Sequence, residues 1–361
     1  MPVSPKLALR LALELRGIYE AATNGLIRAI AVQVGRGAQD VTWQDRKLEA
    51  LTLLMHDVDR TIDELRREVP GAVERALGYA YRRGAAVGSA EAEAAGIAGS
   101  FNFLPDEEAI TRLLSEAMRP HEEAILGIRR RVQDAYDQAL VRAASTVLTG
   151  AGTRVDAARS ALSFLADRGI TGFTDRSGRK WDIASYGEMV TRTASGHAAI
   201  EGHMDRLTGL GVDTVYVSDS PEECDLCRPF EGEVLSISGN TTGKLSDGTE
   251  VLCSVAEARS RGLYHPNCTH SQSIYLPGFT DVPTDTEDAD DYELRQRQRA
   301  YERRIRKWKR RVEIEEAVTG KDDPHAKDAR RKLRAVQAEF KAWREANGRQ
   351  AQTQRTNLHV R

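Results

Sequence analysis

The sequence predicts a mainly α-helical protein with a small α+β middle domain and a C-terminal helical hairpin. Up to about Gly150 the chain is rich in Ala, Leu, Arg and Glu, and its apolar residues recur at helical spacing. After Arg168 aromatic and β-branched residues flank a turn-forming run, and after Asp290 two amphipathic segments follow one another. We therefore expect a helical N-terminal region over 1–168, an α+β domain over 169–280, an acidic linker with a charged helical hairpin over 281–347, and a disordered tail over 348–361.

Length and charge narrow the class of protein. At 361 residues the chain can form two or three domains. Its 52 Lys and Arg against 54 Asp and Glu give a formal net charge of −2, so overall charge gives no reason to expect nucleic-acid or membrane binding. Charged residues interrupt every apolar stretch before it reaches the roughly 18 residues of a membrane span, and they break the N-terminal pattern of a signal peptide. We expect a protein made in a cytoplasm, where its four cysteines stay reduced as thiols or metal ligands.

Long helices are expected in the N-terminal region. A segment over 7–22 fits a helix, although its alternating leucines also fit a strand. A second helix follows Thr42, a candidate N-cap, and should end at Pro70. Its apolar stripe consists of Leu48, Leu51, Met55, Val58, Ile62 and Leu65. A third helical stretch runs over 107–148, with Pro120 as a kink or a break.

The middle of the chain mixes strands and helices. Phe173 and Trp181 flank a run of turn-forming residues, which predicts a β-hairpin. Ser185 and Glu188 have the spacing of a capping box, in which a hydroxyl and a carboxylate satisfy free backbone donors at a helix start. The run 212–217 then predicts a strand.

The last part of the chain predicts a linker and two paired helices. Residues 280–293 are acidic and contain Pro, as is typical of a solvated linker. Gly320 can end the first helix, and Asp323 followed by Pro324 can start the second. The two apolar stripes that would pack together are Tyr301, Ile305, Trp308 and Val312, and Leu333, Val336, Phe340 and Trp343.

Cysteine and histidine residues are concentrated after the expected strand. Cys224 and Cys227 form a C-x-x-C pair, and about forty residues later come His265, Cys268 and His270. Two ligand pairs separated by a loop are typical of a tetrahedral zinc site, in which a closed shell of four ligands holds structure and leaves no position for water. We therefore expect a Cys/His zinc-type knuckle with a structural zinc ion. The favoured ligands are Cys224, Cys227, His265 and Cys268, with His270 as an alternative to His265.

Other interpretations of these residues stay open. The thiols can be small buried side chains without a metal, beside hydrogen-bonding histidines. Cys253 is a weaker ligand candidate because Ser254 and Glu257 have the spacing of a capping box. A redox pair is disfavoured because the residues after Cys227 lead into a turn and not into a helix. The zinc-deaminase, phosphate-loop, metalloprotease and hydrolase motifs are absent, so we expect no enzyme; an unrecognised active site is the third alternative.

Several stretches between Gly169 and Gly278 occur in an order that a known family shares. They are 171–182, the helical segment with Tyr186 and 189–193, the pair Cys224 and Cys227, and 263–270 followed by 277–278. In this order they resemble the minor capsid (minor head) proteins of tailed bacteriophages, namely the phage minor capsid protein 2 and Mu F-like head morphogenesis families. The Mu F-like pattern often ends in H-P-x-C-x-C. Here His270 takes the last position, and such an exchange preserves a zinc ligand.

The resemblance implies a structural, low-copy component of the virion, placed at the portal vertex or in the capsid interior and acting in head assembly or DNA packaging. Its implied partners are the portal protein and/or the major capsid protein, and the N-terminal region would dock to them. Some Mu F-type relatives carry a C-terminal toxin or enzyme domain, for which the charged hairpin here is too short. The runner-up function is a zinc-stabilised nucleic-acid-binding module.

Positive charge is concentrated in the first helix of the expected hairpin. Ten of the seventeen residues over 295–311 are Lys or Arg, and Glu302 is the only acid among them. Such a face would neutralise DNA phosphates without reading sequence. The alternative is a solvated face whose charge is balanced by the acidic linker. The candidate DNA or partner contacts are Arg295, Arg297, Arg299, Arg303, Arg304, Arg306, Lys307, Lys309, Arg310 and Arg311.

Overall fold

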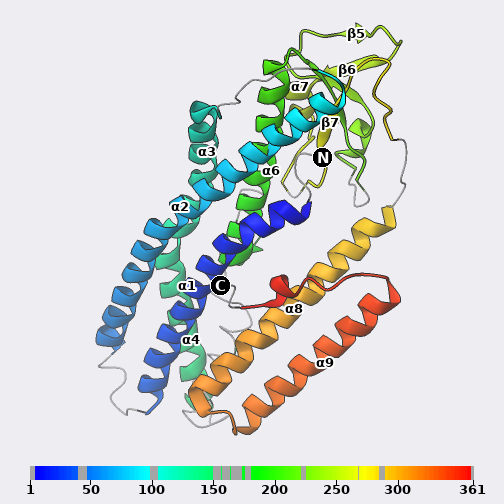
Figure 1. Ribbon diagram of the computed structural model, residues 1–361. Helices are drawn as coiled ribbons and strands as arrows, with labels where there is room; N and C mark the ends of the chain where they lie inside the picture. Colours follow the sequence, from blue (N-terminus) through cyan, green and yellow to red (C-terminus); the bar gives the residue numbers. More distant parts are fainter. Residues whose placement is uncertain are drawn as a thin grey trace. The chain divides into compact units, whose positions relative to one another are not determined.

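The computed structural model describes residues 5–39, 47–97, 105–148, 156, 163, 173–174, 180–220, 225–266, 268–283 and 289–358. These residues fall into two compact units. The first contains Met1–Leu13, Gly71–Arg119 and Glu188–Gln296, and the second contains Glu14–Pro70, Pro120–Gly187 and Arg297–Arg361. Each unit therefore combines three separate stretches of the chain. The predicted mainly helical composition is confirmed (Figure 1).

Two long helices begin the chain, α1 over Pro5–Gln39 and α2 over Lys47–Ala94. The helical interpretation of the alternating leucines is thus confirmed, whereas the expected end at Pro70 is wrong because this proline lies inside α2. A proline in a helix costs about 3 kcal/mol. Four residues after it, Ala72, Val73, Ala76 and Leu77, are all buried, and burial of this continuing face outweighs the cost. The candidate cap Thr42 lies outside the described residues.

The third helical stretch is divided into α3 over Glu107–Leu126 and α4 over Ile128–Leu148. Pro120 lies within α3, and the interruption falls at Gly127. Glycine weakens a helix because it loses the most backbone freedom on folding. The break expected near Pro120 is therefore displaced by seven residues to the glycine.

The predicted β-hairpin and the helix after it are both present. Strands β1 (Phe173–Thr174) and β2 (Lys180–Trp181) pair antiparallel, with Phe173 opposite Trp181. Helix α6 runs over Ile183–Gly209. It is capped by Asp182, whose Oδ1 accepts the backbone N–H of Ser185 at 3.1 Å, so the capping box expected at Ser185 and Glu188 is wrong by three residues. Aspartate is as good an N-cap as serine.

A five-stranded mixed sheet follows within the described residues. Its strands are β3 (Thr214–Val217), β4 (Val234–Ser236), β5 (Gly243–Lys244), β6 (Glu250–Ser254) and β7 (Gln272–Ile274). The strand order is β5-β6-β4-β3-β7; β4 and β6 are parallel, and the other neighbours are antiparallel. Helix α7 (Val255–Ser260) begins at the predicted cap, where Ser254 Oγ accepts the N–H of Glu257 at 3.1 Å.

One hydrophobic core joins the sheet to the helices of the first unit. Its members come from α2, α6, the sheet, α7 and the two segments that carry the cysteines, and include Ala92, Ile200, Leu207, Val215, Val217, Cys227, Leu235, Val255, Leu263, Tyr264 and Ile274. In β3, Val215 and Val217 enter this core, and Tyr216 between them packs with a second cluster on the other face. The cysteine segments are therefore part of the core.

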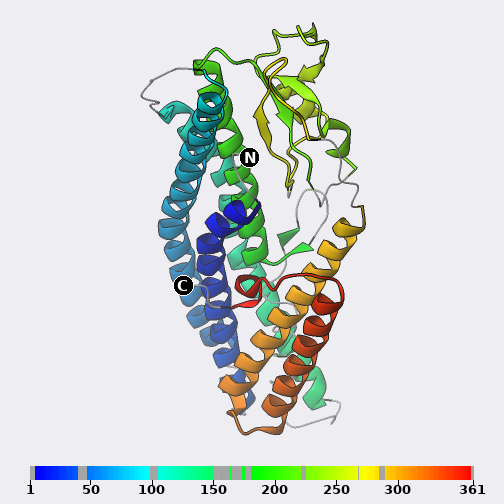
Figure 2. The same cartoon turned by 45° about the vertical axis from the view of Figure 1, so that its right-hand side comes forward.

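The predicted C-terminal hairpin is confirmed. Helix α8 covers Ala289–Thr319 and α9 covers Pro324–Ala346, and they lie antiparallel side by side (Figures 1 and 2). Asp323 caps α9 as expected, and Gly320 has a φ of +89°. Seven of the eight predicted stripe residues form one cluster, which consists of Tyr301, Ile305, Trp308, Leu333, Val336, Phe340 and Trp343. Because α8 begins at Ala289, the end of the expected acidic linker is helical.

The segment after α9 is ordered up to Leu358, so the expectation of a disordered tail over 348–361 is wrong for its described part. A 3₁₀ helix, η2, covers Thr353–Thr356, and the side chains of Arg355 and Leu358 are buried. Buried arginines bind this segment through its backbone. Arg16 donates to the carbonyl oxygens of Arg355 and Asn357, and Arg306 also donates to that of Arg355.

Candidate metal centre

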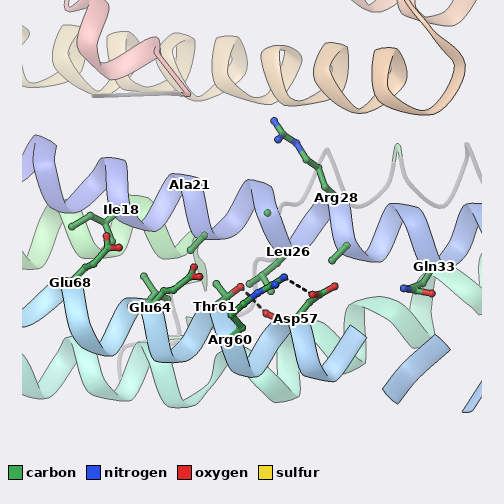
Figure 3. A pocket seen from close by; sticks show the side chains of 14 residues that line it. Ile18, Ala21, Leu26, Arg28, Gln33, Asp57, Arg60, Thr61, Glu64 and Glu68 are labelled. Atoms are coloured by element: carbon green, nitrogen blue, oxygen red, sulfur yellow. Dashed lines mark hydrogen bonds and ion pairs between the residues drawn. The ribbon is translucent and has the colours of Figure 1, made fainter. Parts of the chain in front are cut away.

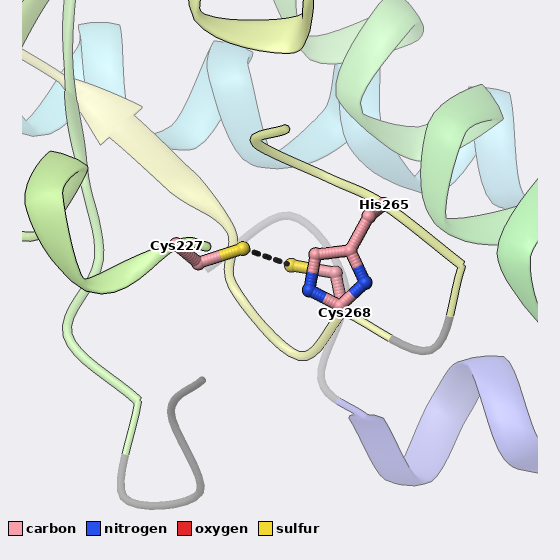
Figure 4. Close-up of side chains that lie close together, drawn as sticks. All are labelled: Cys227, His265 and Cys268. Carbon is pink, nitrogen blue, oxygen red and sulfur yellow. Dashed lines mark hydrogen bonds between the residues drawn. The ribbon is translucent and has the colours of Figure 1, made fainter. Parts of the chain in front are cut away.

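Three of the five predicted ligands meet in the first unit. Cys227, His265 and Cys268 each place a ligand atom within 4.8 Å of the other two, and the two Sγ atoms are 3.5 Å apart (Figure 4). Cys227 lies in the turn before η1 (Arg228–Phe230), and the other two lie in the loop between α7 and β7. The predicted convergence of the two segments is confirmed for these residues. Cys224 lies outside the described residues.

The loop that carries His265 starts from a sharp helix end. Leu263 N–H donates to the carbonyl oxygen of Ala258, and Gly262 N–H donates to that of Arg259, which is a Schellman motif at the end of α7. Gly262 has a φ of +116°, which favours glycine. Tyr264, two residues later, has a φ of +61°. Among the residues that the structure describes, it is the only one other than glycine with a positive φ. A bulky residue in this region costs roughly 1–3 kcal/mol, so other contacts must hold it there.

The loop directs a backbone donor at the Cys268 sulfur. Cys268 N–H donates to the carbonyl oxygen of His265 at 2.9 Å, which closes a tight turn. The backbone N–H of His270 then donates to Cys268 Sγ at 3.3 Å. A backbone donor on sulfur favours the thiolate, which is the form of cysteine that binds metals.

His270 lies beside the three clustered residues. Its Nδ1 is 3.4 Å from Cys268 Sγ, and its Nε2 bonds to the carboxylate of Glu231. Metal-binding histidines commonly have one ring nitrogen on the metal and the other on a carboxylate or carbonyl. His265 has a similar arrangement, because its Nδ1 bonds to the Pro266 carbonyl oxygen at 2.8 Å. Both predicted histidines are therefore oriented by a second partner.

The protonation of these groups is coupled. The Cys268 thiol, and then burial, raise the pKa of Cys227. Hydrogen bonding to Cys227 raises the pKa of His265. Burial lowers the pKa of His270, but bonds to Cys227 and Glu231 outweigh it and raise the pKa above its ordinary value. Each imidazole thus faces a thiol, which is the donor set that Zn²⁺ takes up with release of protons.

The distance between the two sulfur atoms fits a zinc ion with tetrahedral coordination. Two thiolates about 2.3 Å from a zinc ion lie about 3.8 Å apart at the tetrahedral angle, near the 3.5 Å between Cys227 and Cys268. Cys227, Cys253 and Cys268 are all free thiols. Cys253 lies outside the cluster, as expected, and packs at the margin of the core. Of the three, Cys227 is buried, and Cys253 and Cys268 are partly exposed.

Several residues around the centre were not indicated by any pattern in the sequence. Tyr264 O–H donates to Gln272, whose amide nitrogen is 3.3 Å from Nδ1 of His203. Nε2 of His203 bonds to Glu91 at 2.8 Å, and Glu91 also accepts the N–H of Ile274. Burial raises the pKa of Glu91, but these bonds outweigh it and lower the pKa. A continuous chain of buried and partly buried hydrogen bonds therefore joins the loop to α6 and α2.

The predicted basic face of α8 is largely paired within the second unit. Arg299 pairs with Glu302, Arg304 with Glu339 and Arg310 with Asp182, while Arg306 is buried against the C-terminal segment. For Arg299, Arg304 and Arg310 the balancing charge comes from carboxylates outside the linker, whose acidic residues at 284–288 lie outside the described residues. Arg297 and Arg303 are exposed and, within the part of the chain that the structure describes, form no ion pair. DNA or partner contact by this helix stays a prediction.

A groove of about 580 Å³ lies between α1 and α2 in the second unit (Figure 3). Small residues such as Ala21, Ala22 and Gly25 line it together with charged side chains, of which Asp57 and Arg60 pair at 2.6 Å. It has no Cys, His or Ser in its lining. The groove therefore offers shape and charge to a ligand.

Comparison with known proteins agrees with the predicted resemblance. The profile of the family "Phage minor capsid protein 2" matches residues 3–344. The chain belongs to this family. It is 23% identical over 188 residues to a "Structural protein" of Lactococcus phage LL-H, and the alignment covers 51% of each chain. This minor capsid family member thus spans about half the length of the curated relative it matches. No solved structure gives a significant match.

The family makes the chain a structural protein of a bacteriophage particle, as the sequence motifs predicted. The match extends far beyond the motif region, through the N-terminal helices and to within two residues of the end of α9. Among its described residues, no helix combines the length and the apolar character needed to cross a membrane.

Proposed function

We propose that this chain is a low-copy structural component of the phage head, located at the portal vertex or in the capsid interior, that acts in head assembly and DNA packaging by binding and not by catalysis. The observation that carries the proposal is the family match over 3–344, which includes the helices as well as the cysteine segments. The portal protein and the major capsid protein are the proposed partners.

The proposal includes a structural zinc ion in the knuckle. Cys227, His265 and Cys268 would hold it, with Cys224 or His270 as the fourth ligand. The bound ion supplies a crosslink between two segments about forty residues apart, and a filled shell leaves no place for a reactive water. The knuckle is part of the core of the first unit, so the crosslink would stabilise the sheet against α6 and α2.

Purified particles test the role in the head. We expect a copy number far below that of the major capsid protein, and labelled protein at a single vertex or inside the shell. Particles assembled without the portal protein distinguish the two locations, because a portal-bound protein would be lost from them. A copy number equal to that of the major capsid protein, or absence from assembled heads, would contradict the proposal.

Metal analysis of the purified full-length chain tests the zinc ion. We expect about one zinc per chain, and loss of that zinc in Cys227→Ser and Cys268→Ser, because each substitution removes a clustered thiol. Cys253→Ser is the matched control, since it removes a thiol outside the cluster and should keep the zinc. Zinc content unaffected by Cys227→Ser would show that the ion is held elsewhere.

A further inference from the structure

Tyr264 holds the knuckle loop in a conformation that its own chemistry disfavours. Its φ of +61° lies in the left-handed region, and the residue is neither glycine nor asparagine. The side chain is 3% exposed, so the strain sits in the core and not on a mobile surface. Backbone strain at a buried position persists only where surrounding contacts determine it, and it points to a function at that place.

His197 on α6 supplies a contact that determines this backbone. Its Nε2 lies 2.7 Å from the carbonyl oxygen of Tyr264. Burial lowers the pKa of His197, so the ring is neutral, and Nε2 carries the proton that it donates to the carbonyl. Helix α6 is 27 residues long and places the donor from outside the loop.

The direction of His265 depends on the peptide that His197 holds. The dihedral angles of one residue set where the next residue lies, so the left-handed turn at Tyr264 decides which way His265 leaves the core. Here His265 lies within 4.8 Å of Cys227 and Cys268 (Figure 4). If Tyr264 relaxed to a negative φ, the next Cα would move and the imidazole would leave the two sulfurs.

The other side of Tyr264 is fixed independently. Its hydroxyl donates to Gln272 at 3.1 Å, and the ring lies 5.8 Å from the guanidinium of Arg259. These contacts hold the side chain, whereas the bond from His197 holds the backbone. The two can therefore be removed one at a time.

We propose that His197 is a positioning residue of the knuckle, which holds the Tyr264 peptide in the left-handed conformation so that His265 faces Cys227 and Cys268. The inference rests on the zinc centre proposed above. Outer-shell partners of this kind typically change metal affinity by about 10–100-fold when removed.

Zinc affinity of the full-length chain, measured by competition with a chromophoric chelator, tests the proposal. His197→Leu removes the donor at similar volume and should weaken zinc binding by about tenfold or more. His197→Gln keeps an N–H donor at the same reach and should stay within about threefold of the wild type. Tyr264→Phe removes only the hydroxyl and should likewise leave the affinity within about threefold.

A destabilised control separates positioning from general loss of structure. Leu113→Ala on α3 removes buried apolar surface in the same unit from a helix outside the loop, so it should lower the melting temperature and keep the zinc affinity. Cobalt substitution adds a spectroscopic readout: the tetrahedral visible bands should weaken in His197→Leu and persist in His197→Gln.

The outcomes distinguish the two proposals. If the wild type binds zinc and His197→Leu binds it equally well, the positioning role is wrong and the zinc centre stands. The same conclusion follows if His197→Gln is as weak as His197→Leu, because the donor then has no special part. If the wild-type chain binds no zinc at any concentration tested, the zinc centre and the positioning role both fail.

Discussion

Burial sets the protonation state of His121 in the second unit. Its side chain is fully buried, and its Nδ1 shares a hydrogen bond of 3.0 Å with the hydroxyl of Tyr19. Burial lowers the pKa of His121 from 6.5 to about 4. The folded protein therefore keeps this imidazole neutral, and an unfolded chain takes up a proton there below about pH 6.5. The stability that depends on His121 is present above that pH and is lost as the pH falls toward 4.

This linkage predicts a measurable acid sensitivity. Between pH 7 and pH 5 His121 should lower the free energy of unfolding by about 2 kcal/mol. His121→Asn cannot take up the proton, so its stability should fall by about that much less over the same interval. The four tryptophans of the chain lie at positions 43, 181, 308 and 343, all within the second unit, so urea unfolding followed by tryptophan fluorescence reports this unit.

His56 provides the control for the acid prediction. It is exposed on α2 in the same unit, so His56→Asn should keep the pH dependence of the wild type. An equal fall in stability for the wild type and His121→Asn would show that the buried imidazole does not drive the acid sensitivity.

Residue chemistry made part of the candidate site predictable from the sequence. The spacing of cysteines and histidines identified Cys227, His265 and Cys268, because metal ligands must be of these types. Glu231 and His197 had no such signal, since any surface carboxylate or helical histidine looks alike in a sequence. The positive φ of Tyr264 was also invisible, because turn patterns anticipate glycine or asparagine at such positions.

Two glycines set how closely α2 and α6 approach in the first unit. A Cβ added to Gly84 would lie 1.8 Å from the carbonyl oxygen of Ala199, and one added to Gly202 would lie 2.2 Å from that of Tyr81. Each helix therefore presents a glycine to the backbone of the other. Because backbone atoms cannot swing aside as a flexible side chain can, the helices would have to separate to admit a methyl group.

The glycine contacts give an element-scale prediction with an internal control. Gly84→Ala and Gly202→Ala should each destabilise the first unit by about 1–3 kcal/mol. Gly196→Ala on α6 meets no atom within 4 Å, so it should stabilise by about 0.5–1 kcal/mol through helix propensity alone. Thermal unfolding followed by far-ultraviolet circular dichroism, with hydrogen exchange of α6 peptides, measures both the destabilisation and the stabilisation. Stabilisation by all three substitutions would refute the close approach.

Elements were predictable where local chemistry decides them. The caps at Ser254 and Asp323 were found from residue type and spacing, since a side-chain oxygen must meet free backbone donors. Pro70 was misjudged because its effect on the backbone is local, whereas the packing that keeps α2 continuous comes from residues distant in sequence. The apolar stripes of the α8–α9 hairpin were predicted correctly because the spacing of apolar residues along a helix indicates which face is buried.

At the scale of the whole molecule, the domains expected from the sequence and the compact units of the structure divide the chain differently. The expected domains are consecutive stretches, and their boundaries stay predictions. Each compact unit instead combines three stretches, and the helices α1, α2, α3, α6 and α8 contribute residues to both. Composition and periodicity describe neighbours along the chain. They carry no information on which distant segments pair, so this arrangement could not be predicted from them.

The C-terminal segment shows how distant pairing acts in the second unit. Arg16 on α1 is 1% exposed and donates to the carbonyl oxygen of Arg355, 339 positions away, at 3.0 Å. It also pairs with Glu20 at 2.8 Å. Arg306 on α8 donates to the same Arg355 oxygen at 2.7 Å. Two buried guanidinium groups thus share one short segment of backbone among their acceptors.

Removing this segment should therefore destabilise the second unit although it contributes few apolar side chains. A chain that ends at Gly348 leaves the Arg16 and Arg306 donors without these acceptors, and we expect a loss of about 2–4 kcal/mol in the free energy of unfolding. A chain that ends at Leu358 keeps these contacts and should match the full-length protein. Urea unfolding followed by tryptophan fluorescence measures the difference. Equal midpoints for the chains ending at 348 and 358 would mean that solvent replaces these acceptors without cost.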